Sequence, residues 1–344
     1  MFEHVHQIHL IVANCVGVSA VGKLFLTWGK KVSGSDLHGG IFSDELVPMG
    51  ADVKLGHAAE YVPEDADLVV YSSAVPESNP ERQAASRRGI RQVSLAEFLG
   101  ELALGYTTIA VTGTHGKSTT TAMIGKMLED ARLDPTVIVG SRVPGWPLGN
   151  VRSSEFGVWS ARNLQPTNSE PRTSNYLVIE ACEHMAHHLK IHPDIGVITN
   201  IEFDHPDFYR DLEHVEEVMQ TWSRQCGDVV RVEEESEPNL KLKIPGNYNQ
   251  RNAAGALAVA RLLKLDERQA RGQPFLVLPR PPGHVHEREL ELVDAQRNEQ
   301  ARQVREVAIV GLGDDGVGDD AQAELLDVAD ARDGLQERPR GAGQ

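Results

Sequence analysis

The sequence predicts an α/β protein with a Rossmann-like N-terminal domain (1–105) and a central domain of the P-loop ATPase type with a parallel sheet (106–268). Three observations support this prediction. Short apolar strands alternate with helical stretches over residues 5–100, a glycine-rich loop follows a strand at 108–112, and a second strand–helix series continues to about residue 268. Such alternation is typical of parallel, doubly wound sheets.

The first domain is expected to have one edge that binds ligands. We expect strands at 6–13, 31–36 and 67–71, with helices at 18–28 and 80–88. In parallel sheets, ligands bind at the carboxyl ends of the strands. The segments 13–17, 35–36 and 72–74 should therefore lie along one edge.

A dinucleotide site in this domain is disfavoured. It would need the pattern G-x-G-x-x-G after the first strand. The sequence there is Val12-Ala13-Asn14-Cys15-Val16-Gly17, which has a single glycine. The residues therefore give little support for NAD binding.

The central domain is expected to contain strands at 108–112, 136–139, 176–180 and 194–199, an edge strand at 229–234, and helices at 118–128 and 249–263. The polar stretch 152–175 reads as an inserted loop. After residue 268 no lysine and a single aromatic residue occur, and helical or strand periodicity is weak. We expect residues 269–344 to form an irregular tail, either disordered or a degraded C-terminal domain.

The most informative motif is Gly113-Thr114-His115-Gly116-Lys117-Ser118-Thr119-Thr120. A strand, a glycine-rich turn and a helix in this order form a phosphate-binding loop, in which backbone N–H groups and the helix N-terminus face a polyphosphate. Lys117 can reach the β- and γ-phosphates, and the Ser118 hydroxyl can bind Mg²⁺. Val111 stands at the first glycine of the general pattern, so this loop is a variant. The predicted nucleotide contacts are Gly113, Thr114, His115, Gly116, Lys117, Ser118 and Thr119.

Three further polar clusters follow strands or open a helix. Glu180-Ala181-Cys182-Glu183 offers carboxylates that suit Mg²⁺, although surface acids are the alternative. The stretch 199–207 contains His205, which we interpret as a metal ligand or phosphate contact. Asn249 and Asn252 lie three residues apart on one face of a helix start, where their amides suit a purine edge or cap the helix.

Composition limits the function classes. The 344 residues have a net charge of −16, which argues against a general nucleic-acid binder. An N-terminal signal pattern and an 18-residue apolar run are both missing from the sequence, so we expect a cytoplasmic protein without a membrane partner. Three scattered cysteines are too few for a disulfide framework or a zinc site. The oligomeric state stays open.

The four motifs, in this order, resemble those of the Mur ligase family over roughly residues 6–268. The family patterns G-T-[HN]-G-K-[ST]-T-T, E-A-D-E, T-N-[IL]-x-x-D-H and G-x-H-N-x-x-N-A-A are similar to 113–120, 180–183, 199–205 and 246–254. In the first domain, the segments 8–11, 34–36, 71–76 and 79–81 are most similar to the alanine-adding members of the family.

The resemblance implies an ATP-dependent acid–amino-acid ligase. It would join L-alanine to UDP-N-acetylmuramate through an acyl phosphate, in peptidoglycan synthesis and hence cell wall biogenesis, cell shape and cell division, with ATP and Mg²⁺ as cofactors. The implied catalytic residues are Lys117, Glu180 and His205. Ser118 and Glu180 would hold one Mg²⁺ and His205 a second, Asn249 and Asn252 would lie near the adenosine, and the UDP-sugar would be bordered by Ser19, Asp36, Ser72 and Ser73.

Several positions depart from the family pattern. Val12, Asn14 and Cys15 replace glycines of the first loop, Cys182 replaces an aspartate, and the pair His184-Met185 and residue Tyr248 also differ. No third-domain motif is recognisable after residue 268. Two alternatives therefore stay open: a nucleotide- and UDP-sugar-binding remnant without turnover, and the related ligase that attaches a recycled tripeptide. The amino acid or peptide accepted is also open.

Overall fold

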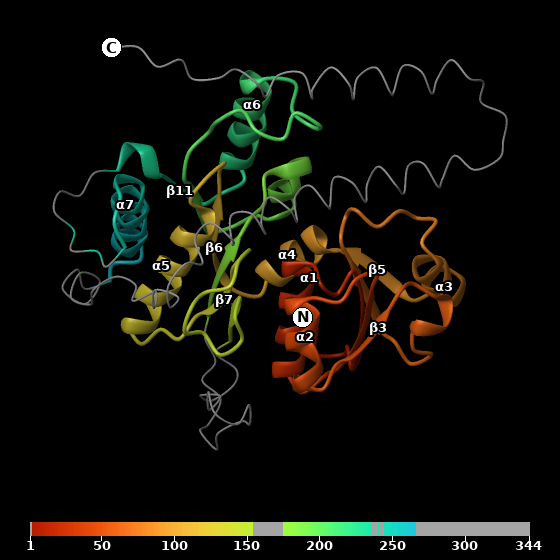
Figure 1. The fold of residues 1–344 in the computed structure, drawn as a ribbon. Helices are drawn as coiled ribbons and strands as arrows, with labels where there is room; N and C mark the ends of the chain where they lie inside the picture. Colours follow the sequence, from red (N-terminus) through yellow and green to blue (C-terminus); the bar gives the residue numbers. More distant parts are fainter. Residues whose placement is uncertain (1, 154–174, 236–239, 241, 243, 266–344) are drawn as a thin grey trace, which may run out of the picture. The chain divides into compact units, whose positions relative to one another are not determined.

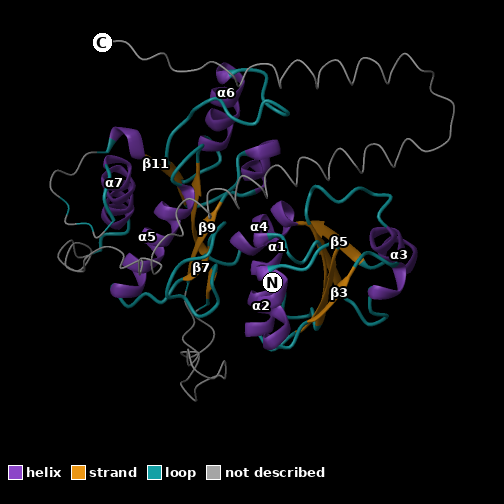
Figure 2. Cartoon of the chain, in the orientation of Figure 1, coloured by secondary structure: helices purple, strands orange, loops and turns teal. Residues whose placement is uncertain are grey.

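The structure is a computed structural model that describes residues 2–153, 175–235, 240, 242 and 244–265. It forms two sheets of mainly parallel strands, one from each predicted domain (Figures 1 and 2). The predicted fold class is therefore confirmed for the described residues. The predicted tail at 269–344 and most of the predicted inserted loop lie outside them, and the domain boundaries stay a prediction.

The first sheet has five parallel strands in the order β3-β2-β1-β4-β5. Val21 and Leu24 of α1 pack with Ile8 and Leu10 of β1 in one apolar core, whereas α3 packs with Ile11 in another. Helices thus cover both faces of this sheet, as Figure 1 shows. The elements are β1 (Gln7–Ile11), α1 (Val16–Thr27), β2 (Lys31–Asp36), α2 (Ile41–Leu46), β3 (Asp52–Leu55), β4 (Leu68–Tyr71), α3 (Pro80–Arg88), β5 (Arg91–Ser94) and α4 (Leu95–Ala103), with short 3₁₀ helices η1 (Val47–Met49) and η2 (Ala59–Tyr61).

The second sheet has six strands in the order β11-β10-β6-β9-β7-β8, and only the β7–β8 pairing is antiparallel. Helices α5 and α7 pack on each other and on an apolar core of β6 and its neighbours. The elements are β6 (Thr107–Thr112), α5 (Lys117–Asp130), β7 (Thr136–Ile138), β8 (Val151–Arg152), β9 (Tyr176–Glu180), η3 (His184–Lys190), β10 (Ile195–Ile198), α6 (Leu212–Ser223), β11 (Asp228–Arg231), η4 (Val232–Glu234) and α7 (Asn247–Leu262).

The register of the second sheet aligns the predicted clusters. Val111 of β6 pairs with Glu180 of β9 on one side and with Val197 of β10 on the other. Because the strands are parallel, the loops after β6, β9 and β10 leave the sheet at the same edge. The phosphate-binding motif, the acidic cluster and the His205 cluster consequently lie together.

The predicted elements are present with small changes in their ends, and the predicted edge strand is β11. Six α-helices and strands were not predicted from the sequence: α2, β3, β5, α4, β8 and α6. Arg152, expected in an inserted loop, belongs to β8. Among the described residues, no helix combines the length and the apolar character needed to cross a membrane.

Candidate nucleotide and metal site

The glycine-rich loop joins β6 to α5, and Gly116 is central to its shape. Gly116 precedes Lys117 with φ 84°, a left-handed conformation that side chains disfavour. A Cβ on Gly116 would also lie 2.8 Å from Oδ1 of Asn252. Asn252 of α7 therefore lies against the loop. Asn249 instead donates its amide to the Pro245 carbonyl (2.7 Å), so only one of the two predicted amides contacts the loop.

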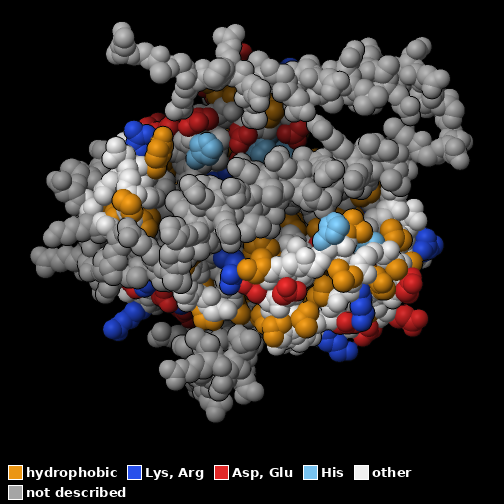
Figure 3. Space-filling model, viewed as in Figure 1, with side chains coloured by type: hydrophobic (Ala, Val, Ile, Leu, Met, Phe, Trp, Pro, Cys, Tyr) orange, Lys and Arg blue, Asp and Glu red, His pale blue; other side chains and the backbone are white. Residues whose placement is uncertain are grey.

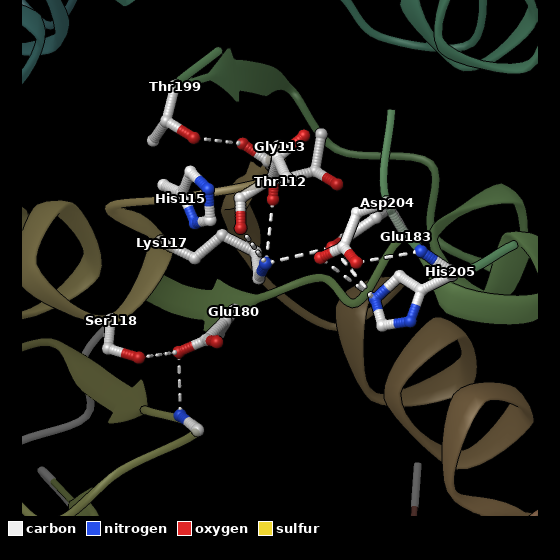
Figure 4. Close-up of polar contacts among 12 residues, drawn as sticks. Thr112, Gly113, His115, Lys117, Ser118, Glu180, Glu183, Thr199, Asp204 and His205 are labelled. Carbon is white, nitrogen blue, oxygen red and sulfur yellow. Dashed lines mark hydrogen bonds and ion pairs between the residues drawn. The ribbon is translucent and has the colours of Figure 1, made fainter. Parts of the chain in front are cut away.

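The ammonium of Lys117 faces oxygens of the loop and of Glu183 (Figure 4). Its Nζ donates to the carbonyl oxygens of Gly113 (2.7 Å) and Thr114 (3.1 Å). It also lies 3.0 Å from both carboxylate oxygens of Glu183, a nearly fully buried side chain. Glu183 thus fixes the direction of the one cation in the loop, a role that the sequence analysis did not assign to it.

Ser118 and Glu180 meet at the start of α5. Ser118 Oγ donates to Glu180 Oε2 (2.8 Å), and the Gly140 backbone N–H donates to the same oxygen (2.7 Å). A Cβ on Gly140 would lie 2.6 Å from Glu180 Oε1, so a larger residue there would displace the carboxylate. A serine hydroxyl beside a fixed carboxylate is a set of hard oxygen donors, which fits Mg²⁺.

The segment that follows β10 contacts the glycine-rich loop through hydrogen bonds. Thr199 Oγ1 donates to the Thr112 carbonyl (3.1 Å), and the His115 backbone N–H donates to Asn200 Oδ1 (2.8 Å). The Glu202 N–H donates to Thr114 Oγ1 (2.9 Å). The polar residues of this segment therefore position the loop, whereas the His115 imidazole is exposed.

His205, which was expected at a second magnesium ion, lies beside Glu183. Its Nε2 is 3.5 Å from Glu183 Oε1 and 3.8 Å from Asp204 Oδ2 (Figure 4). Its backbone has φ 55°, which is rare for a residue other than glycine. Glu183 consequently connects Lys117 to His205 in a chain of alternating charge.

Burial and charge shift the pKa values of these groups in opposite directions. Burial raises the pKa of Glu180 above its ordinary value, because desolvation disfavours the charged form. Burial also opposes ionisation of Glu183, but the His205 hydrogen bond and the Lys117 charge outweigh it and lower that pKa. The same contact with Glu183 raises the pKa of His205. A bound cation would favour the charged form of Glu180.

The predicted UDP-sugar contacts occupy different environments in the first sheet. Ser72 and Ser73 follow β4, and Ser73 is exposed. Asp36, at the end of β2, accepts hydrogen bonds from the backbone N–H groups of Asn14 (2.8 Å) and His38 (3.0 Å). Ser19 is fully buried in α1 and donates to the Val16 carbonyl. Asp36 and Ser19 therefore shape the first loop through internal contacts.

The replaced glycines have structural consequences in that loop. Val12 has φ 67°, the left-handed conformation that a glycine adopts without strain. Asn14 Oδ1 accepts weak hydrogen bonds from the N–H groups of Phe42 (3.2 Å) and Ser43 (3.3 Å) at the start of α2. The loop thus keeps a backbone suited to glycine while carrying larger side chains.

A buried polar network beneath this edge was not predicted as a site. Glu81, at the start of α3, accepts hydrogen bonds from Ser35 Oγ (2.6 and 2.8 Å) and contacts ring nitrogens of His9 (2.6 Å) and His57 (2.8 Å). Although burial opposes it, the bonds from His57, His9 and Ser35 lower the pKa of Glu81 to about 2. In the sequence, only the motif 79–81 pointed to this network.

Comparisons with known proteins cover both sheets. Residues 7–107 match the family model described as Mur ligase family, catalytic domain, and residues 111–226 match the Mur ligase middle domain. The UDP-N-acetylmuramate–L-alanine ligase of Clostridium tetani is 37% identical over 222 residues, which are 64% of this chain and 44% of that protein. The same-named ligase of Syntrophobacter fumaroxidans is 38% identical over 220 residues, 64% of this chain and 43% of that protein. The chain thus spans less than half the length of these relatives.

Solved structures show the same fold. The UDP-N-acetylmuramate–alanine ligase of Thermotoga maritima superposes with a TM-score of 0.66 at 24% identity, covering 78% of this chain and 68% of that chain. The UDP-N-acetylmuramate:L-alanyl-γ-D-glutamyl-meso-diaminopimelate ligase of Neisseria meningitides gives a TM-score of 0.64 at 22% identity, with 78% and 97% covered. At these identities the likeness supports the arrangement of elements alone.

Proposed function

This chain belongs to the Mur ligase family by its first and middle domains, and we propose that it acts in the ATP-dependent ligation of L-alanine to UDP-N-acetylmuramate. The observation that carries the proposal is the arrangement of Lys117, Ser118 and Glu180 at one edge of the second sheet. The alanine-adding names of the curated relatives support the choice of amino acid.

In the first step, a carboxylate oxygen of the sugar's lactyl group attacks the γ-phosphorus of ATP, and the bond to ADP breaks. Charge builds on the transferred phosphoryl oxygens, so catalysis depends on alignment and neutralisation. Lys117 supplies a positive charge at the loop, and the N–H groups of Gly113 and Gly116 would orient the phosphates, whereas those of Thr114 and His115 donate to Asn200. Mg²⁺, held by Ser118 and Glu180, would neutralise phosphate charge and fix the leaving group.

In the second step, the alanine amine attacks the acyl carbon, the carbon–oxygen bond to the phosphate breaks, and the proton lost by the nitrogen passes to the departing inorganic phosphate or to water. The proposed role of His205 is to assist at the phosphoryl end, either on a second Mg²⁺ or as a cation beside Glu183.

Asn252 lies closer to the loop than Asn249 and is the better candidate for a contact with the adenosine. Ser72 and Ser73, at the end of β4, are the accessible candidates for UDP-sugar contacts.

The test is to incubate the full chain with ATP, Mg²⁺, UDP-N-acetylmuramate and L-alanine. Product formation is measured by the release of ADP and by the mass of the product. We expect alanine-dependent product, and a loss of about a hundredfold or more in kcat/KM for Lys117→Ala. Lys126→Ala is the matched control, because Lys126 lies on the same helix but pairs with Glu129 and Asp130 at the surface. Full activity of Lys117→Ala would contradict the proposal.

Two alternatives are outcomes of the same assay. ATP binding without product would support a nucleotide- and UDP-sugar-binding remnant. Product with the tripeptide L-alanyl-γ-D-glutamyl-meso-diaminopimelate, but not with L-alanine, would support the recycling ligase. The likeness to the ligase of Neisseria meningitides is one of fold alone, so the alanine-adding function is preferred.

A further inference from the structure

Two histidines and an aspartate gather beyond the phosphate-binding loop. His184 begins η3, and His205 and Asp207 lie between β10 and α6. His184 Nε2 is 2.8 Å from Asp207 Oδ2, and the rings of His184 and His205 stack with centroids 4.4 Å apart. One ligand atom from each of the three residues lies within 4.8 Å of the other two. We propose that this cluster binds a first-row transition-metal dication such as Zn²⁺ or Co²⁺.

The donor set favours this class of ion over Mg²⁺. Imidazole nitrogens suit zinc, cobalt and nickel, whereas Mg²⁺ prefers oxygen ligands and retains its water. The proposed cluster differs from the magnesium site of Ser118 and Glu180 in its imidazole donors, and it includes His205, which was considered above for a second Mg²⁺. The proposal does not depend on ligase activity, since the ion would bind without nucleotide.

An ion can be held once the two stacked imidazole rings, whose planes are 26° apart, turn so that one nitrogen of each ring faces it. Tetrahedral zinc with bonds of about 2.0–2.2 Å places its ligand atoms roughly 3.3 Å apart. The His184–Asp207 pair would open from 2.8 Å, and the wider pairs would close from 4.8 Å or less. The side chains of His184, His205 and Asp207 are 33%, 27% and 66% exposed, so an ion can enter and keep a water ligand.

The two loops that carry these ligands are tied together. Tyr209 is buried, and its hydroxyl donates to the carbonyl of Glu183, the residue before His184 (2.5 Å). The N–H groups of Phe208 and Tyr209 both donate to the His205 carbonyl (2.9 Å). These bonds hold the ligand-bearing segments in place before an ion arrives, which lowers the cost of ordering them.

The neighbourhood is rich in the required side chains. Figure 3 shows histidine side chains beside acidic ones on the upper part of the visible face. Glu183 and Asp204 also lie near His205 and form a second possible ligand group with it. His205 belongs to both groups, so an ion at either group would involve this imidazole.

The test is a titration of the metal-free full chain with Co²⁺, read by visible absorption, and with Zn²⁺, read by calorimetry, without nucleotide and with excess Mg²⁺. We expect saturable binding that Mg²⁺ does not displace. The variants His184→Ala and Asp207→Asn should each weaken it about tenfold or more. His192→Ala is the control, because His192 is exposed and outside the cluster.

Two results would overturn the proposal: absence of saturable binding, or binding that both variants leave unchanged. If a variant fails to fold, the X-ray absorption spectrum of the wild-type chain with one equivalent of Zn²⁺ identifies the types of ligand atom that bind the ion. A spectrum with two imidazoles and oxygen ligands supports the cluster. Oxygen-only coordination, or sulfur from the nearby Cys182, contradicts it.

Discussion

At the residue scale, Val12 adopts a backbone conformation that costs stability in any residue other than glycine. Its left-handed φ of 67° disfavours an L-residue by about 1–2 kcal/mol, and β-branching adds crowding. Ala13 N donates to the Ser35 carbonyl (2.8 Å) and Cys15 N to the Val12 carbonyl (3.0 Å). These bonds hold the turn in the conformation that a glycine would adopt freely.

This geometry predicts that the usual order of stability of an alanine and a glycine variant is reversed at Val12. At most sites an alanine variant is more stable than a glycine variant by about 0.5–1 kcal/mol. At Val12 both variants lose the same packing, but only glycine relieves the strain. We expect Val12→Gly to be more stable than Val12→Ala by about 1 kcal/mol. Urea denaturation followed by circular dichroism measures the difference, and the usual order would show that the turn is not left-handed.

At the element scale, helix α3 is joined to the first sheet by its opening residues. Asn79 caps the helix by accepting from the N–H groups of Glu81 (2.9 Å) and Arg82 (3.2 Å), and Pro80 occupies the first turn. Glu81 then reaches His9 of β1 and Ser35 of β2. The motif 79–81, which contributed to the family resemblance, thus has a structural role as a cap and anchor.

The lowered pKa of Glu81 predicts a pH dependence of stability. Its ordinary value is 4.5 and its folded value about 2, so the ionised form stabilises the fold above pH 4.5. This contribution, about 3 kcal/mol, is lost as pH falls from about 5 to 2. We expect the stability advantage of wild type over Glu81→Gln to shrink by most of that amount between pH 6 and pH 2.5 in urea titrations. Parallel pH profiles of the two proteins would contradict the prediction.

At the scale of the whole molecule, nucleotide binding should stabilise the fold through the loop after β6. A ligand that binds only the folded state at 100 times its Kd adds about 2.7 kcal/mol to the free energy of unfolding. We expect ATP with Mg²⁺ to raise the urea midpoint of the full chain. Removing Mg²⁺ with EDTA should reduce the shift, because Ser118 and Glu180 would lose the ion that links them to phosphate. Lys117→Ala should reduce it too, and an unshifted midpoint at saturating ATP would contradict the proposed site.

The sequence alone determined the features that depend on local pattern. The alternation of apolar strands and helices specified two parallel sheets, because each element needs an apolar face of recognisable period. The phosphate-binding loop was specified by a strand, a glycine-rich turn and a lysine-serine pair in succession, because this loop is formed by residues that are neighbours in the sequence. The motif order indicated the family, and the strand ends indicated which polar clusters share an edge.

Only the tertiary structure decided which side chains meet. Glu183, not Glu180, contacts Lys117 and His205, and the approach of His184 to Asp207 joins residues 23 positions apart. Asn252 reaches the loop and Asn249 does not, although both lie at the start of one helix. Such pairings depend on strand register and on side-chain direction across loops, and neither leaves a periodic signal in the chain.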